Sequence, residues 1–547
     1  MFSKLIGALS SRYENNKLLG SVTRCDVLRT MLKHGAIELM GPIMEITQQP
    51  LLLKRLGIDS YQEPIVYMRR ECPICRSEGF ESQARLRVST KNQSIIATLN
   101  VVDDGLLLPG EMGLSNIAWK LLSAKEHESA TVSYAKPIDS LSSVRAKIYG
   151  HELTEKSLNE IVRDITNGRY ADVHLAAFVT ACSGNKLNTA ETIGLTKAMV
   201  NAGESISWTE NHVMDKHCVG GLPGNRTTPI IVSIVAANGL VMPKTSSRAI
   251  TSPSGTADTM ETLMPVSLSI KKMRQVVERE GGCIVWGGAV SLSPADDILI
   301  RVERVLDIDS EGQLVASVLS KKKAAGSNLV LLDLPVGATA KVRNKEFGLD
   351  LSRLLMEVGK ALGLTIKTCL TDGSQPIGFG IGPALEALDV LAVLQNKQQA
   401  PQDLKERALM LAGHLLEMGG AAKPDQGLKL AKFTLESGIA WKKFQAIADA
   451  QGGLYEPPQA TYHYEFYASS YGRICHINNR LISRVAKLAG APDAKAAGIS
   501  LHCRINDLVE TNQPLLTLHA ETPGELRYAQ DFLESHQDVI VIEESKV

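Results

Sequence analysis

A repeating pattern in the second half of the chain limits the folds that it can adopt. After Trp208, short apolar stretches run into glycine turns, and helical sequence follows. The clearest apolar stretches are residues 284–286, 329–332 and 366–370, which precede Gly287, Gly337 and Gly373. A strand, a glycine turn and a helix in succession build open α/β sheets with ligand sites at the strand ends. Residues 208–455 are therefore predicted to form an α/β domain.

The rest of the chain predicts further units around this domain. Residues 141–207 carry apolar residues at helical spacing, which indicates a small helical domain completed by part of 300–325. Residues 84–140 are rich in strand formers, 456–547 mix strands with a helix, and 1–83 show no readable pattern. The predicted fold class is multidomain α/β. A small helical domain and a large α/β domain with a central sheet are flanked by an N-terminal β-rich domain and a C-terminal α+β domain.

Charge and cysteine content narrow the classes of protein. Lys and Arg number 59 and Asp and Glu also number 59, and this balance argues against nucleic-acid or membrane-surface partners. The apolar run 229–241 is interrupted by Asn238 and falls short of the roughly 20 residues of a membrane span. The N-terminus lacks a signal-peptide pattern, and nine cysteines are an odd number for a disulfide framework. A cytoplasmic protein is expected.

Cys72-Pro-Ile-Cys75 is a lone pair of cysteines two residues apart. A zinc site usually needs four ligands, and no second pair at the usual spacing follows. No metal site is therefore predicted. Two ordinary thiols near a turn are one interpretation of this motif, and a metal or redox role is the other.

The segment from Asp215 to Thr227 has the composition of an anion site. Lys216 and a histidine precede the glycine pair Gly220-Gly221, and Thr227 stands where the next helix should begin. Glycines let backbone N–H groups approach an anion, and a helix N-terminus adds free donors. A tight strand-to-helix turn would explain the same residues.

The segment 243–261 is rich in hydroxyl residues, and Arg248 lies among them. A cluster of Ser and Thr residues around Arg248, which ends in Gly255-Thr256, suits the many acceptor oxygens of a phosphate group. Asp258 and Glu261 also fit a capping pair at the start of a helix. The two interpretations are compatible, because a capped helix start also binds anions.

Together, these segments resemble the thymidine/pyrimidine nucleoside phosphorylase family. The likeness is greatest to a long branch of that family, which has an extra N-terminal β-rich domain and includes archaeal AMP phosphorylases. The shared motifs are Lys216-His-Cys218, Gly220-Gly221, Ser246-Ser-Arg248, Gly255-Thr-Ala-Asp-Thr-Met-Glu261 and segments 286–288, 294–297, 316–322 and 375–378. The resemblance covers residues 85–547 and implies a small helical domain facing the α/β domain across a cleft that closes.

The resemblance also implies roles for individual residues. The phosphate-binding positions are Lys216, Cys218, Gly220, Gly221, Thr227, Ser246, Arg248 and Thr256. Cys218 replaces a serine of the family, and a thiol is a weak donor. Ser317 and Lys321 match positions that contact a pyrimidine base. The family's third base contact is an arginine, but Glu303 stands there, so nearby Arg301 is assigned to the base.

The expected activity is that of a thymidine phosphorylase-type pentosyltransferase. Inorganic phosphate would cleave a pyrimidine (deoxy)nucleoside into the base and (deoxy)ribose 1-phosphate, with no cofactor and with a homodimer or larger homo-oligomer as the assembly. His217 is the first candidate general acid because histidine titrates near neutral pH, and Asp258 is the second.

Two alternatives to this activity stay open. An AMP phosphorylase would act on a nucleoside 5′-monophosphate to give ribose 1,5-bisphosphate, with Arg226 or Arg248 recruited for the 5′-phosphate. A non-catalytic nucleotide sensor would explain the departures at Cys218 and Glu303.

Overall fold

The computed structural model describes residues 50–544, apart from 104, 185, 250, 251, 291, 307 and 309. The chain divides into two compact units, Met1–Ala135 and Lys136–Val547. No helix within the described ranges is long and apolar enough to cross a membrane. Most of the N-terminal segment 1–83, up to residue 49, lies outside the described residues.

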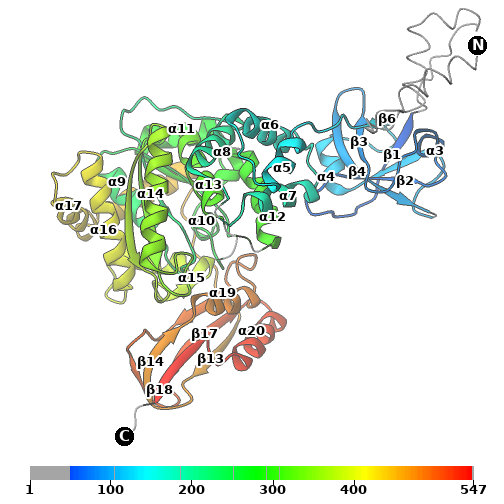
Figure 1. Ribbon diagram of the computed structural model, residues 1–547. Coiled ribbons are helices and arrows are strands. Elements are labelled where there is room, and N and C mark those ends of the chain that lie inside the picture. Colours follow the sequence, from blue (N-terminus) through cyan, green and yellow to red (C-terminus); the bar gives the residue numbers. More distant parts are fainter. Residues whose placement is uncertain are drawn as a thin grey trace, which may run out of the picture. The chain divides into compact units, whose positions relative to one another are not determined.

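A closed six-stranded barrel makes up the described part of the first unit (Figure 1). Its strands are β1 (Leu51–Arg55), β2 (Ile65–Arg69), β3 (Arg85–Ser89), β4 (Ser94–Val102), β5 (Glu111–Leu114) and β6 (Ser129–Tyr134), and its helices are α3 (Pro73–Glu78) and α4 (Asn116–Leu121). The β-rich domain thus begins at Leu51, and the expected start at 84 is too late. Strand β1 pairs in parallel with β5, and β2 pairs in parallel with β4. Such non-local pairing leaves no hairpin signal in the sequence.

The second unit begins with a layer of helices. They are α5 (Leu141–Ile148), α6 (Glu155–Thr166), α7 (Asp172–Cys182) and α8 (Thr189–Asn201), joined by α12 (Pro294–Leu306) and α13 (Glu311–Ala324). Leu158, Ile161, Val162 and Ile165 form the buried stripe of α6. Residues of α12 and α13 share its hydrophobic core, so a later part of the chain completes the helical domain.

Two parallel sheets form the centre of the α/β domain. One has the order β11 (Thr365–Asp372), β10 (Leu329–Val336), β7 (Met214–Cys218), and the other pairs β8 (Met242–Ser246) with β9 (Gly282–Trp286). A parallel bridge between Val213 and Val241 joins them. The surrounding helices are α9 (Thr227–Ala237), α10 (Thr256–Glu261), α11 (Ile270–Glu280), α14 (Lys345–Ala361), α15 (Pro383–Leu394), α16 (Gln402–Met418), α17 (Gly427–Glu436) and α18 (Ile439–Gln451), with the short 3-10 helix η1 (Gly287–Val290). Helix α9 packs against α16 and α18 and is buried along most of its length. A helix buried in this way carries apolar residues on every side.

The C-terminal α+β part has two sheets and two helices. One sheet has the order β12 (Gly380–Ile381), β15 (Gly498–Leu501), β17 (Pro514–Ala520), β13 (Tyr462–Tyr467), and the other β16 (Leu508–Val509), β14 (Gly472–Ile477), β18 (Ile540–Glu544). Helices α19 (Asn479–Leu488) and α20 (Pro523–Ser535) complete it. The Asn479 amide donates to the Gly373 carbonyl at 3.0 Å, and Arg504 donates to the Gly378 carbonyl. The C-terminal part therefore holds the turn that follows β11.

Candidate functional site

The two segments predicted to bind an anion end at one edge of the central strands. Val213 and Val241 form the parallel bridge, and β7 and β8 each run five residues beyond it. Cys218 and Ser246 are the last residues of these strands. Because parallel strands present their carboxyl ends at one edge, the segments after Cys218 and Ser246 begin side by side.

Lys216 lies fully buried in β7 and is fixed on two sides. Its Nζ donates to Thr227 Oγ1 at 2.8 Å and lies 3.6 Å from Asp333 Oδ2. Asp333 is also buried and accepts from Thr371 Oγ1 at 2.6 Å. Thr227 is the first residue of α9, an 11-residue helix. A full positive charge and a helix start therefore lie together at this edge.

The glycine pair after β7 has a backbone conformation that only glycine adopts easily. Gly220 and Gly221 have φ angles of 98° and 78°. A Cβ atom on Gly221 would lie 2.5 Å from the backbone nitrogen of Lys341. The turn therefore needs glycine both for its dihedral angles and for its close approach to a neighbouring loop.

Cys218 occupies the edge as a neutral thiol. Burial, followed by the charge of Asp333, raises its pKa to about 11. The Asn225 amide donates to Cys218 Sγ at 3.3 Å and to Asp333 Oδ2 at 3.1 Å. Asn225 therefore links the thiol to the carboxylate that holds Lys216.

The hydroxyl of Ser246 is the clearest unfilled position of the site. It is buried, and no described residue forms a hydrogen bond with its Oγ atom. Buried polar groups are nearly always paired, so such a hydroxyl marks a place for a ligand or water. Ser246 stands level with Cys218 at the edge described above, which makes an anion held there the natural partner.

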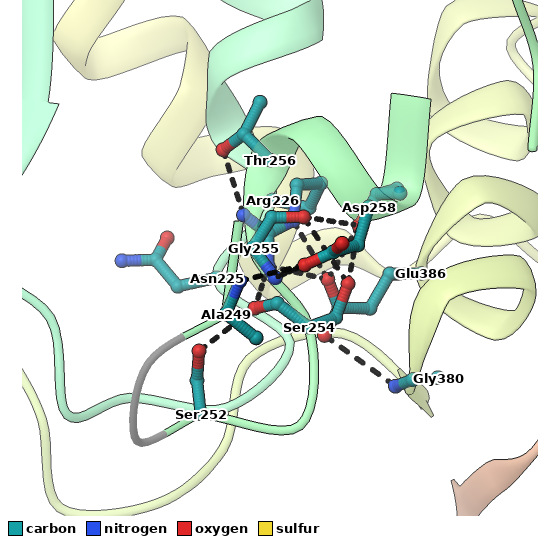
Figure 2. A network of polar contacts seen from close by, with 12 residues as sticks. Asn225, Arg226, Ala249, Ser252, Ser254, Gly255, Thr256, Asp258, Gly380 and Glu386 are labelled. Atoms are coloured by element: carbon teal, nitrogen blue, oxygen red, sulfur yellow. Dashed lines mark hydrogen bonds and ion pairs between the residues drawn. The ribbon is translucent and has the colours of Figure 1, made fainter. Parts of the chain in front are cut away.

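A network around Arg226 fixes the second hydroxyl, that of Thr256 (Figure 2). Arg226 donates through Nη1 to Thr256 Oγ1 at 2.7 Å, through Nε to Glu386 Oε2 at 2.6 Å and through Nη2 to the Ser254 carbonyl at 2.9 Å. Its guanidinium is thus engaged on all three nitrogens. Arg226 positions Thr256, and the expected recruitment of Arg226 for a 5′-phosphate finds no support in this arrangement.

Two of the expected functional residues have structural partners instead. Arg248 donates to both carboxylate oxygens of Glu261 at 2.7 Å, and its guanidinium lies 4.8 Å from the centre of the Trp286 ring. Asp258 accepts the backbone N–H groups of Ala249 and Gly255 at 2.7 and 3.0 Å (Figure 2). Asp258 therefore caps a turn and Arg248 pairs with carboxylates in this structure, and the acid and phosphate-binding roles expected of them stay predictions.

His217 lies in a strongly cationic environment. Side chains alternate along a strand, so His217 points away from the side of Lys216 and Cys218. Burial, together with the charges of Lys322, Lys244 and other lysines, holds the pKa of His217 well below its usual value of 6.5. The neutral imidazole is therefore favoured in this structure, and in that form it still carries one N–H donor, while the general-acid role of His217 stays a prediction.

Substitutions at His217 distinguish these two roles. His217→Gln keeps an N–H donor and is expected to retain kcat/KM for the phosphorolysis expected from the sequence within ~10-fold, whereas His217→Ala is expected to lose ~10²-fold. The ratio of kcat/KM in the wild type to kcat/KM in His217→Gln should not change with pH around 6.5, because the imidazole is already neutral there. An acidic limb near pH 6.5 that disappears in His217→Gln would instead assign the proton transfer to His217.

The expected base-binding residues divide into two groups. Ser317 and Lys321 lie four residues apart on α13, which places them on one helix face. The Lys321 ammonium forms an ion pair with Asp296 of α12. Arg301 of α12 forms an ion pair with Asp172 of α7 and so belongs to the packing of the helical domain. The assignment of Arg301 to the base therefore has no support in this structure.

A buried charge cluster ties the two halves of the site together. Asp215 of β7 forms ion pairs with Lys244 of β8 at 3.1 Å and with Lys322 of α13 at 3.0 Å, and all three residues are buried. Burial, with the nearby charge of Lys244, lowers the pKa of Lys322 to about 7. The cluster connects the helix of Ser317 and Lys321 to the strands that end at Cys218 and Ser246.

Sequence reasoning passed over several residues that organise the site. They are Asp215, Asn225, Lys244, Lys322, Asp333 and Glu386. A charged residue that interrupts an apolar run was the available signal, as at Asp333 within 329–336. Buried charges need partners, so such an interruption indicates a buried ion pair. Within the described residues, no group of three or more His, Cys, Asp or Glu could hold a metal ion.

The fold and this edge define a protein of the α/β class with a candidate anion site at its strand ends. Family sequence models match residues 142–203 ("Glycosyl transferase family, helical bundle domain"), 210–441 ("Glycosyl transferase family, a/b domain") and 474–539 ("Pyrimidine nucleoside phosphorylase C-terminal domain").

Several relatives match nearly the whole chain. A "Putative thymidine phosphorylase" of Polaromonas sp. (strain JS666 / ATCC BAA-500) is 58% identical over 91% of this chain and 98% of its own. "Putative thymidine phosphorylase 2" of Acidovorax sp. (strain JS42) is 60% identical over 90% of this chain and 96% of its own. The chain belongs to the thymidine/pyrimidine nucleoside phosphorylase family, which confirms the resemblance found in its motifs.

Proposed function

We propose that the protein cleaves the glycosidic bond of a pyrimidine nucleoside with inorganic phosphate, giving the free base and ribose or deoxyribose 1-phosphate. The observation that carries the proposal is the buried, unpartnered hydroxyl of Ser246 at the strand edge that Lys216 and Thr227 also approach. A lysine, a helix start and hydroxyls together suit a phosphate dianion. The names of the relatives support the same chemistry.

The proposed reaction needs only groups of this chain and phosphate. Phosphate binds Lys216, the Gly220-Gly221 backbone, Thr227, Ser246 and Thr256. As the C1′–N bond lengthens, positive charge develops on the sugar, and a phosphate oxygen attacks C1′. The bonding electron pair leaves with the base, whose negative charge Lys321 and the N–H of His217 stabilise, and the base then takes up, through water, the proton that hydrogen phosphate loses on forming the ester. No cofactor or metal ion is part of the proposal.

The state of the arginines favours a nucleoside over a nucleoside 5′-monophosphate. Arg226 is held by Glu386, and Arg248 is held by Glu261 and Asp258. An arginine that already pairs with a carboxylate must break that pair before it can bind a phosphate. The two residues considered for a 5′-phosphate are therefore both committed to other partners.

A matched substrate panel tests the proposal. Thymidine, uridine, AMP, CMP and UMP are incubated with and without inorganic phosphate, and the free base is followed by chromatography. We expect phosphate-dependent release of thymine or uracil from the nucleosides, and a loss of ~10²-fold or more in Ser246→Ala. Release only from the monophosphates would assign the chain to AMP-type phosphorolysis. Binding without release of any base would identify a nucleotide sensor.

A further inference from the structure

Gln313 is a buried side chain of α13 whose polar atoms have no partner. It is 6% exposed, and neither its Oε1 nor its Nε2 forms a hydrogen bond with a described residue. Among the residues that the structure describes, it is the one buried side chain that leaves two polar atoms unpaired. Buried polar groups are nearly always paired, so an amide of this kind marks a place for a ligand or water.

A second buried glutamine shows how this fold treats an amide that serves structure alone. Gln451, the last residue of α18, is 3% exposed. Its Oε1 accepts the Ile284 N–H at 2.8 Å, and its Nε2 donates to the carbonyls of Pro265 and Ile284 at 2.8 and 3.0 Å. Both ends of the Gln451 amide are therefore satisfied by the protein, whereas both ends of the Gln313 amide remain available.

The unpaired amide belongs to the helix face that carries two expected base-binding residues. Gln313, Ser317 and Lys321 follow one another at intervals of four residues along α13 and so form one ridge on its surface. Val318 and Leu319 of the same helix belong to the core that α13 shares with β10 and α14. The ridge of Gln313 therefore lies on a different side of α13 from this core.

Two contacts place this ridge beside the start of α12. The Lys321 ammonium forms an ion pair with Asp296, and the hydroxyl oxygens of Ser320 and Ser293 lie 3.3 Å apart. The Lys321 side chain is 22% exposed and Ser317 is partly exposed, whereas Gln313 is buried. Exposure thus decreases along the ridge, and a ligand held at Lys321 and Ser317 has Gln313 at its inner end.

We propose that Gln313 recognises the base: its Oε1 accepts the N3–H of a uracil or thymine ring, and its Nε2 donates to the neighbouring carbonyl oxygen. A glutamine amide carries an acceptor beside a donor, which complements the donor and acceptor on the edge of a diketo pyrimidine. This role rests on the proposed phosphorolysis, in which Lys321 stabilises the departing base. It supplies a base contact in a chain that has Glu303 where the family has an arginine.

An unpaired amide gives discrimination among bases. A buried amide without partners destabilises the free protein, and a diketo pyrimidine supplies both missing hydrogen bonds. A base that lacks the complementary groups leaves the amide unpaired in the complex and is therefore rejected. Gln313 thus assigns the substrate class to nucleosides whose base has a free N3–H next to a carbonyl group.

Replacing Gln313 by methionine tests this role, because methionine keeps the length of the side chain and removes the amide. The substrates are uridine or thymidine, whichever the wild type cleaves faster, and its N3-methyl derivative. We expect Gln313→Met to lower the ratio of kcat/KM for the nucleoside to kcat/KM for the N3-methyl derivative by ~10-fold or more. The KM for phosphate should stay unchanged. An unchanged ratio in an active variant would overturn the role of Gln313 and leave the proposed phosphorolysis intact.

Urea unfolding separates base recognition from a structural role. An apolar side chain in place of an unpaired buried amide should leave the midpoint of unfolding unchanged or raise it. Gln451→Met is the matched control, because it removes an amide that is fully paired within the protein. Its midpoint should fall, and its ratio of kcat/KM should stay that of the wild type. A Gln313→Met protein that behaves like Gln451→Met in both measurements would show that Gln313 serves the fold alone.

Calorimetric titration with free uracil, thymine and 3-methyluracil in the presence of phosphate tests recognition without turnover. Gln313→Met should raise the Kd of uracil or thymine by ~10-fold and leave that of 3-methyluracil unchanged. The same Kd values in the wild type and the variant would overturn the role of Gln313, and so would a wild type that binds none of the three bases. If the Kd values differ as expected but the wild type releases no base from any nucleoside, the proposed phosphorolysis alone fails.

Discussion

Replacing Lys216 by methionine is expected to lower kcat/KM for phosphorolysis by ~10³-fold, with most of the loss in the KM for phosphate. Lys216 is fully buried and supplies the ammonium nearest to Thr227 at the start of α9. Its removal takes the full positive charge from the proposed anion site. It also leaves Asp333 buried without its cation, at a cost of ~3 kcal/mol in the free energy of unfolding. Steady-state kinetics with varied phosphate and urea unfolding measure the two effects.

The surface variant Lys432→Met is the matched control, because it makes the same side-chain change in an exposed ion pair with Glu436. It should alter the free energy of unfolding by less than ~0.5 kcal/mol and leave the kinetics unchanged. The double variant Lys216→Met/Asp333→Asn removes the stranded charge and should recover part of the stability, but none of the activity. If activity returned with stability, Lys216 would serve folding alone.

Local patterns in the sequence were sufficient to predict the α/β domain and the strand edge that carries the site. A strand, a glycine turn and a helix succeed one another within a few residues, so their spacing is visible without the fold. Lys216 and Thr256 stand out by the same local signals, whereas Ser246 was assigned only by the family resemblance. The barrel strands β1 and β2 were not predicted, because their partners lie far along the chain.

Side-chain partners were harder to predict than backbone elements. Arg248 stands in a loop of hydroxyl residues, and its guanidinium would suit either a phosphate or a carboxylate. The structure pairs Arg248 with Glu261, and Lys495 of the C-terminal part reaches the same carboxylate at 3.1 Å. A contact across more than 200 residues leaves no local trace in one sequence. The lowered pKa of His217 was equally hidden from the sequence, because its causes are burial and then the charges of Lys322 and Lys244, which belong to other elements.

Replacing Glu386 by glutamine is expected to raise the KM for phosphate by ~10²-fold, although Glu386 has no atom at the proposed anion site. Glu386 is buried and holds the Nε and Nη2 atoms of Arg226 at 2.6 Å, and Arg226 in turn donates to Thr256 Oγ1. Without the carboxylate, the buried guanidinium loses its counter-charge and shifts, and Thr256 shifts with it. A displacement of about 1 Å in a binding group is sufficient for an effect of this size.

The division of the effect between KM and kcat shows whether Glu386 positions Thr256 or only stabilises the fold. A positioning role predicts that saturating phosphate restores most of kcat, while the free energy of unfolding falls by ~3 kcal/mol because a buried charge pair is broken. Glu436→Gln, the same change in an exposed ion pair of α17, should alter neither quantity. Glu386→Asp keeps the charge and should recover stability more than phosphate affinity, since the shorter side chain cannot hold Arg226 in the same place. An unchanged KM for phosphate in Glu386→Gln, together with lowered stability, would contradict positioning and reduce Glu386 to a structural role.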